Sequence, residues 1–302
     1  MPIHPSGITA LAIDFMARWV SVSAADAAFN TDRRCTAALR DDGVIGLPFQ
    51  QALADGANQR HFGGMQTTAT EITIRRAGER GQADHGWLQS HHTFSFADYH
   101  DPAHMGFRAL RVINDDWIAP GQGFGTHPHR DMEIFSYVLS GTIEHRDSLG
   151  NGRQLKPGQI QLMSAGRGVT HSEFNPSATE PLRLLQVWIR PRERGLTPSY
   201  TEWHPRPEHA RLAKVLVISP DGRDGSATIH QDAEVYRLRL GPGGTVTHDL
   251  RPGRGVWVQV AEGALNFQGV PLATGDGAST ESPGTLRLAG SPSAEALLFD
   301  LG

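Results

Sequence analysis

Gly125-Thr126-His127-Pro128-His129 is followed, 44 residues after its first histidine, by His171-Ser172-Glu173. In each segment two side chains that commonly bind metals stand at positions i and i+2, which point to the same face of a β-strand. Two such pairs on facing strands can present three imidazoles and one carboxylate to a single ion. Such a set leaves coordination positions open for a substrate or dioxygen, as in catalytic metal sites. Either pair alone is compatible with ordinary strand histidines, whereas both pairs together, each flanked by turn glycines, favour the metal site.

The composition describes a globular protein with many turns. A length of 302 residues suffices for two domains or one large β domain, and 34 glycines and 19 prolines indicate frequent turns. The formal net charge of -4 gives no reason to expect a nucleic acid or an anionic membrane as partner. No apolar run approaches the roughly 18 residues of a membrane helix. The single cysteine, Cys35, excludes an intrachain disulfide and fits a reducing compartment, so we expect a cytoplasmic protein.

Residues 1–65 differ from the rest of the chain. They contain an amphipathic helical stretch and then Ala-, Asp- and Gly-rich sequence without strand periodicity. Asp14 and Arg18 interrupt the apolar residues 8–22, and no positive region precedes them, which argues against a targeting signal. We expect residues 1–65 to be a helical or disordered extension outside the folded core, of which residues 1–64 are absent from the native protein if translation starts at Met65.

From Met65 onward, short β-rich runs recur about every ten residues and are separated by Gly and Pro clusters. They cover residues 71–75, 109–113, 134–139, 142–147, 159–163 and 184–189, and then 215–218, 234–240, 256–260, 264–268 and 296–301. Strands at that spacing predict an antiparallel sandwich or barrel.

A proline- and charge-rich stretch, residues 190–207, predicts a connection between two domains. Residues 262–267 resemble residues 140–145 in rhythm, so the second half is expected to repeat the architecture of the first. We predict a metal-binding domain over residues 66–195 and a second domain over residues 196–302. The second domain has no i, i+2 histidine pair, and His230 and His248 stand alone in its strand-rich part, so we expect it to lack a metal.

Longer motifs surround both ligand pairs. The first pair continues to Glu133 within residues 127–133, and the second follows the Gly-rich residues 164–168. These frames resemble the two signature motifs of the cupin superfamily, a double-stranded β-helix that holds one metal in its bowl. Cupins usually take their glutamate from the first motif, which here is Glu133. A glutamate that follows the second-motif histidine, here Glu173, is instead the pattern of the pirin family.

The resemblance to the pirin family extends well beyond these motifs. The further landmarks are Gly86-Trp87-Leu88, His92-Thr93-Phe94-Ser95-Phe96-Ala97, Asp101-Pro102, Met105-Gly106-Phe107 and Leu110-Arg111-Val112-Ile113-Asn114-Asp115-Asp116. Residues from about 66 to 302 resemble a complete bacterial pirin of the quercetinase-like branch, whereas residues 1–64 match nothing in it. The resemblance implies an all-β bicupin with its metal in the first domain.

Position by position, the resemblance places the metal ligands on His127, His129, His171 and Glu173. Glu133 is then expected to orient a ligand or Arg130 without binding the metal. Sequence spacing alone permits either glutamate. Imidazole and carboxylate ligands without a thiolate suit one divalent ion, Fe(II) first of all, and also Mn, Co, Ni, Cu or Zn. Because histidines must be neutral to bind, we expect metal occupancy to fall below about pH 6.

Pirins of this branch are known as quercetin 2,3-dioxygenases, and this activity fits the site. The flavonol 3-hydroxyl would reach the metal, which lowers its pKa as it lowers that of a bound water. Glu173 would accept the proton as general base, and dioxygen would open the ring with release of carbon monoxide. We expect Phe94, Phe96 and Met163 to shield the reaction from water. We expect the protein to be a monomer that acts on a flavonol-like small molecule and dioxygen.

Two other functions stay open. Some pirins are metal-binding, redox-responsive regulatory proteins that act through contacts with protein partners, and in that case the ion would switch a surface. The landmarks at residues 113–116 and 124–129 favour the enzymatic branch. A cupin isomerase or epimerase is the third reading, against which stands the lack of a basic cluster for a sugar phosphate in the sequence.

The other histidines are first given structural roles. His91 and His92 lie in an aromatic stretch and are expected to pack or to line a pocket. His145 follows the first ligand strand and is expected to face away from the site. Trp188 is expected in the core.

Overall fold

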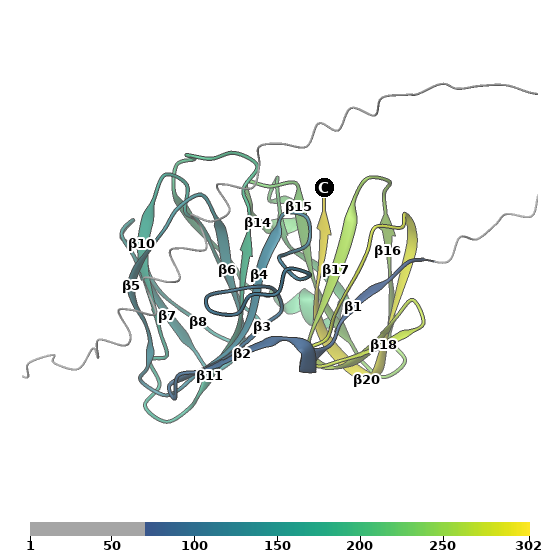
Figure 1. Cartoon of the computed structure of the whole chain (residues 1–302), viewed down its shortest axis with the longest axis horizontal. Coiled ribbons are helices and arrows are strands. Elements are labelled where there is room, and N and C mark those ends of the chain that lie inside the picture. The colour runs from purple at the N-terminus through teal and green to yellow at the C-terminus, as the bar shows by residue number, and fades with distance from the viewer. Residues whose placement is uncertain (1–69) are drawn as a thin grey trace, which may run out of the picture.

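The computed structural model describes residues 70–302, and within them nearly every regular element is a β-strand. Two strand-built halves lie side by side (Figure 1). The predicted all-β bicupin is thereby confirmed. The predicted helical stretch near the N-terminus and Cys35 lie outside the described residues.

The first half packs a seven-stranded sheet against a four-stranded sheet. The larger sheet runs in the order β12 (Ser199–Trp203), β9 (Ile160–Ser164), β6 (Glu133–Ser140), β11 (Leu182–Ile189), β4 (Leu110–Ile118), β3 (Leu88–His92) and β2 (Gly81–Asp84). The smaller sheet runs in the order β5 (Gly123–His129), β10 (Val169–Phe174), β7 (Ile143–Asp147) and β8 (Gly152–Leu155). Apolar side chains of both sheets, among them Phe124 and Trp188, form one buried cluster.

The second half is a single nine-stranded sheet that bends around its own apolar core. Its main order is β1 (Thr73–Arg75), β19 (Gly277–Thr280), β17 (Gly255–Phe267), β20 (Gly284–Leu301), β15 (Ala233–Leu240), β13 (Lys214–Ser219) and β14 (Ala227–Thr228), with β16 (Thr245–Leu250) on β20 and β18 (Val270–Ala273) on β17. Three short 3-10 helices, η1 (Ala77–Glu79), η2 (Pro207–Arg211) and η3 (Arg223–Gly225), connect strands.

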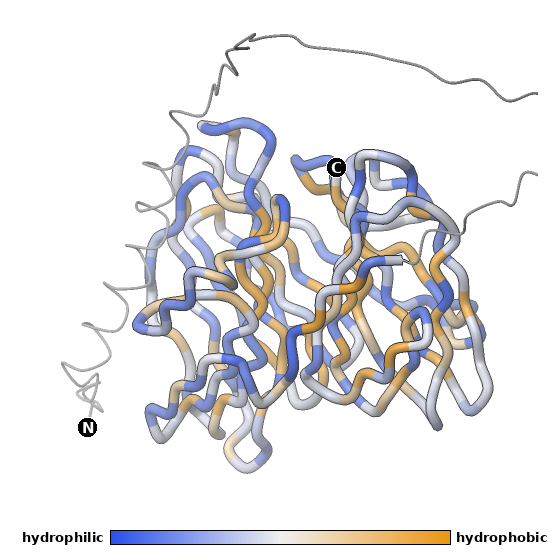
Figure 2. Tube along the Cα trace, turned by 45° about the vertical axis from the view of Figure 1, so that its right-hand side comes forward, coloured by the Kyte–Doolittle hydropathy of each residue, from blue (hydrophilic) through white to orange (hydrophobic). Residues whose placement is uncertain are grey.

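The two halves share strands and a core. β1, from the start of the described chain, pairs with β19 in the second half, and β12, from within the predicted connection, pairs with β9 in the first. A third apolar cluster joins side chains of both halves, and in it the rings of Phe94 and Trp257 lie 4.8 Å apart. Apolar segments run through the interior of both halves, as Figure 2 shows. The predicted division at residue 196 did not foresee that β1 and β12 each pair with a strand of the other half.

Within residues 70–302, no helix is long and apolar enough to span a membrane.

Candidate metal centre

The two histidine-containing segments form neighbouring strands of the smaller sheet. β5 and β10 pair antiparallel, with His171 directly opposite His127. Along both strands exposed and buried residues alternate, and His127, His129, His171 and Glu173 all fall on the buried face. A register shift lies between His171 and Glu173, because β5 carries one extra residue there. The i, i+2 rule therefore placed the four side chains on the interior face, between the two sheets.

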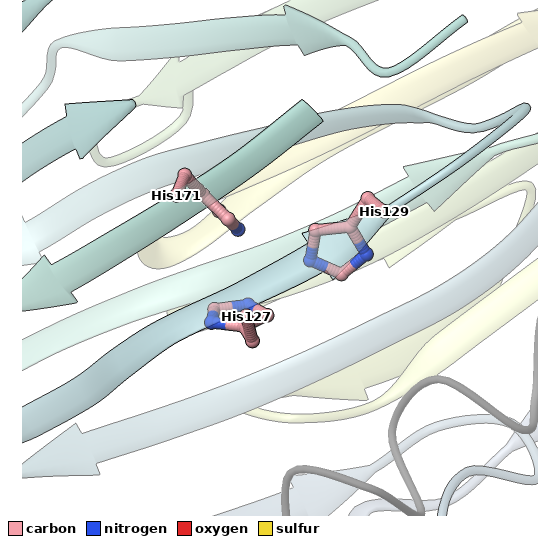
Figure 3. Close-up of side chains that lie close together, drawn as sticks. All are labelled: His127, His129 and His171. Carbon is pink, nitrogen blue, oxygen red and sulfur yellow. The ribbon is translucent and has the colours of Figure 1, made fainter. Parts of the chain in front are cut away.

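Three imidazoles converge on one point (Figure 3). The ring centroids of His127 and His171 lie 4.4 Å apart, those of His127 and His129 4.8 Å, and those of His129 and His171 4.9 Å. One nitrogen from each ring lies within 4.8 Å of the others. All three side chains are buried. The spacing and burial fit three ligands of one ion.

The hydrogen bonds of the imidazoles also fit a metal. Nδ1 of His127 lies 2.8 Å from the carbonyl oxygen of Gly125 and donates to it, so Nε2 is the ring nitrogen that carries the lone pair used in metal coordination. Ligating histidines usually donate their second nitrogen to a carbonyl or carboxylate in this way. Neither ring nitrogen of His171 has a hydrogen-bond partner among the described residues, although the side chain is buried. Buried polar atoms need a partner, and a cation would supply one.

Glu173 lies next to this group rather than inside it. Its carboxylate clusters with His171 and His145, with one atom of each within 4.8 Å of the others. Three donors from the larger sheet hold it. Ser136 Oγ donates to Oε1 at 2.9 Å, Gln186 Nε2 donates to Oε2 at 2.7 Å, and Gln161 Nε2 also donates to Oε1. The carboxylate is thus fixed in the space between the sheets.

Burial governs the charges of the centre. It lowers the pKa of His127 to about 4 and the pKa values of His129 and His171 well below the usual range, and the neighbouring imidazoles add to the effect. All three rings are therefore neutral near pH 7, which is the form that binds a metal. Burial raises the pKa of Glu173, against the hydrogen bonds of its three donors. A divalent cation at this point would favour the carboxylate form.

His145 is the residue of this region that the sequence reasoning missed. Its side chain is fully buried and faces the centre, with its ring 5.3 Å from that of His171. Nε2 lies 3.1 Å from Oδ2 of Asp147, and the ring stacks on Tyr200 at 4.8 Å. The expectation that it faces away is wrong. His145 and Asp147 have the same i, i+2 spacing as the ligand pairs, and that signal could have found them.

Glu133 is occupied elsewhere. Ser164 Oγ donates to its Oε1 at 2.7 Å, and the backbone N–H of His230, in the second half, donates to Oε2 at 3.2 Å. Ser164 and His230 thus engage both oxygens of the Glu133 carboxylate.

Of the three residues expected to shield the reaction from water, two belong to the apolar cluster that borders the imidazoles. Phe96 and Met163 belong to the same buried cluster as Trp188, whose ring meets that of His129 at 5.0 Å. Phe94 instead packs in the core shared by the two halves, so its expected role beside the metal is wrong.

The packing roles expected for His92 and Trp188 are confirmed. Nδ1 of His92 lies 2.8 Å from Oδ1 of Asn114, and its ring lies 5.2 Å from that of Phe96. Trp188 is 1% exposed.

A double-stranded β-helix with three neutral imidazoles and a carboxylate on its inner face is typical of a cupin, and this cluster suggests a divalent-metal site. Comparison with known proteins agrees. Residues 73–189 match the family model described as Pirin, and residues 216–301 match the model described as the quercetinase C-terminal cupin domain.

Relatives place the chain more narrowly. The quercetin 2,3-dioxygenase of Escherichia coli strain K12 is 53% identical over 230 residues, which cover 76% of this chain and 98% of that protein. The crystal structure of YhhW from Escherichia coli is 52% identical, with a TM-score of 0.74 over 77% of this chain and 98% of that one. The structure of the bacterial pirin YhhW in complex with nickel(II) has a TM-score of 0.73 at 52% identity, over 76% and 99%. The chain belongs to the pirin family, and the resemblance to its quercetinase-like branch is confirmed.

Proposed function

We propose that this protein is a metal-dependent quercetin 2,3-dioxygenase that opens the flavonol ring with dioxygen and releases carbon monoxide. The metal is held by His127, His129, His171 and Glu173, and Fe(II) is the first candidate ion. The convergence of three buried, neutral imidazoles beside a fixed carboxylate is the observation that carries the proposal. The curated relatives named quercetin 2,3-dioxygenase supply the substrate class.

The ion, when bound, supplies Lewis acidity toward the flavonol 3-hydroxyl and open positions for oxygen ligands. Glu173 then has two tasks. Its carboxylate completes the charge of the ligand set, and it accepts the proton of the hydroxyl at one of its oxygens. A carboxyl group whose pKa is raised by burial is a better base than a solvated one, because its protonated form is less costly there.

The larger sheet orients this base. Ser136, Gln161 and Gln186 donate three hydrogen bonds to the carboxylate and so limit its rotation. Since three donors stabilise the ionised form, they also keep Glu173 able to accept a proton. The apolar cluster that contains Phe96 and Trp188 borders the imidazoles and excludes water from that side.

The test is anaerobic reconstitution with Fe(II), followed by quercetin and oxygen with detection of carbon monoxide. We expect loss of the flavonol absorbance together with carbon monoxide. Metal-loaded protein that consumes no quercetin and releases no carbon monoxide would overturn the proposed activity and favour a regulatory role. Parallel reconstitution with Mn, Co, Ni, Cu and Zn identifies the ion that supports the highest turnover.

A further inference from the structure

A linked set of three side chains in the second half has no part in the proposed reaction. Lys214 begins β13, His248 lies on β16 and Asp300 lies on β20. Nζ of Lys214 is 2.8 Å from Nδ1 of His248, and Nε2 of His248 is 2.7 Å from Oδ2 of Asp300. His248 and Asp300 are buried, whereas Lys214 is partly exposed. An amine, an imidazole and a carboxylate therefore form one chain of contacts that leads from the surface into the sheet's interior.

The contacts have a direction. A lysine ammonium can only donate hydrogen bonds, so Nδ1 of His248 accepts a hydrogen bond from Lys214, and Nε2–H of His248 donates one to Asp300. Arg254 fixes the carboxylate, because its Nε donates to Oδ1 and its Nη2 donates to the carbonyl oxygen of Asp300 at 3.1 Å. Nucleophile, base and orienting group stand in this order in enzymes that form covalent intermediates.

The surroundings of the amine favour its reactive form. Nζ of Lys214 also donates to the carbonyl oxygen of Thr247 at 3.1 Å and lies 4.6 Å from the centroid of the Tyr236 ring. Burial lowers the pKa of Lys214 despite nearby carboxylates. The titratable and charged groups around it are His248, Tyr236, Glu234, Asp249 and Asp300. Near neutral pH a larger share of this amine is uncharged than of a solvated lysine amine.

The residue type at position 214 is informative in this chain. Of its 28 Lys and Arg residues only two, Lys156 and Lys214, are lysines. An arginine would supply the same positive charge and the same contact with the Tyr236 ring. A guanidinium, however, stays protonated in proteins and cannot act as a nucleophile. Lysine at this position therefore supplies a lone pair that arginine lacks.

We propose that Lys214 is a nucleophilic amine that forms an imine with small aldehydes, with His248 as its base and Asp300 as the group that orients His248. His248 takes one proton from the ammonium, and the amine nitrogen then bonds to the carbonyl carbon. The two remaining N–H hydrogens leave with the carbonyl oxygen as water, and the C=N bond replaces the C=O bond. The step needs no oxidant or reductant. It gives the second half of the molecule a covalent binding site of its own.

The chain carries its own control for a test, because the second lysine, Lys156, is exposed. Full-length, metal-loaded protein is treated near pH 7 with propionaldehyde and sodium cyanoborohydride, which traps each imine as a stable propylamine. Peptide mass spectrometry gives the initial rate at each lysine. We expect Lys214 to be trapped at least ~10-fold faster than Lys156, below the ~10²–10⁴-fold that a positioned general base typically contributes. A rate at Lys214 equal to or below that at Lys156 overturns the proposal.

Two variants then test the relay. His248→Gln and Asp300→Asn should each bring the Lys214 rate down toward that of Lys156, while Lys156→Arg should leave the Lys214 rate unchanged. Near-UV circular dichroism checks that each variant is folded. A folded His248→Gln or Asp300→Asn protein with the wild-type rate at Lys214 would refute the role of the imidazole. If neither variant folds, the wild-type comparison of the two lysines decides alone.

Discussion

Substitution of Glu173 by glutamine separates its two proposed tasks. The change keeps the size of the side chain but replaces one carboxylate oxygen by an NH2 group, which cannot accept. Because both oxygens of Glu173 accept hydrogen bonds from Ser136, Gln161 and Gln186, at least one buried donor then faces another donor. A mismatched buried pair of this kind costs about 1–3 kcal/mol of folding stability. The three imidazoles are untouched, so the site keeps most of its metal when the ion is saturating.

The turnover of quercetin should fall far more than the metal content. Loss of a general base typically lowers a rate by about 10²–10⁴-fold. Metal content is measured by elemental analysis, and turnover by quercetin absorbance and carbon monoxide release from the same sample. The matched control is Ser136→Ala, which removes one donor but leaves the carboxylate, and for which we expect a loss of less than ~10-fold. Equal losses of metal and turnover in Glu173→Gln would refute the base and leave a purely structural ligand.

Four other outcomes follow from the same geometry. His171→Ala should weaken metal binding by at least ~100-fold with the β fold retained; unchanged elemental analysis would exclude His171 as a ligand. His145→Phe keeps the stack on Tyr200 and removes one hydrogen bond to Asp147, whose carboxylate still accepts from Leu149 and Asn151, so we expect a stability loss of about 0.5–1.5 kcal/mol at full metal content, and metal loss would instead make His145 a ligand. An ordinary histidine pKa led us to expect metal release below about pH 6, but burial lowers the pKa of His127 to about 4, so metal should stay bound at about pH 6 and dissociate as the pH approaches 4; half-release at about pH 6 in equilibrium dialysis would contradict this. Burial raises the pKa of Asp116 to about 7, above its unfolded value of 3.8, so the contribution of this group to stability should fall by on the order of 4 kcal/mol as pH rises between these values, while the buried histidines contribute in the opposite direction; the difference in urea-unfolding free energy between the metal-free wild type and Asp116→Asn should show this fall, and a difference that does not change with pH would contradict it.

The regular strands were predictable because their signals are local. The runs at residues 234–240 and 296–301 fall within β15 and β20, where alternation or continuous apolar sequence matches the burial of each residue. Residues 256–260 and 264–268 were predicted as two separate β-rich runs. They form the single strand β17, in which register shifts lie on both sides of Glu262-Gly263 and Gly263 takes a φ of 72°. The glycine here serves a bulge in a bent strand rather than a turn.

The strand β12 was not predicted, because its formation depends on the tertiary structure. Its residues, Ser199–Trp203, lie between proline-rich segments, and the composition of the stretch indicated a connection. The strand forms because β9 offers it an unpaired edge, which is a feature of the tertiary structure and not of the local sequence. The pairing of β12 with a strand of the other half cannot be deduced from the periodicity of its own residues.

The metal centre likewise has a part that the sequence predicts and a part that it does not. The positions of His127, His129 and His171 follow from strand alternation, since a period of two fixes the face of each side chain. The donors that hold Glu173 come from β6, β9 and β11 on the opposite sheet, at least 12 positions away in sequence. No sequence pattern places them, because packing of the two sheets brings them together.

The central claim is that one ion, bound by three imidazoles and Glu173, carries the oxygenase activity. It is tested most directly by the rate of carbon monoxide release measured against bound metal, from metal-free to fully loaded protein, with His171→Ala treated in parallel. The account predicts a rate that rises in proportion to bound metal up to about one ion per chain, and no release from His171→Ala. Carbon monoxide released by metal-free protein, or by His171→Ala at the wild-type rate, would contradict it.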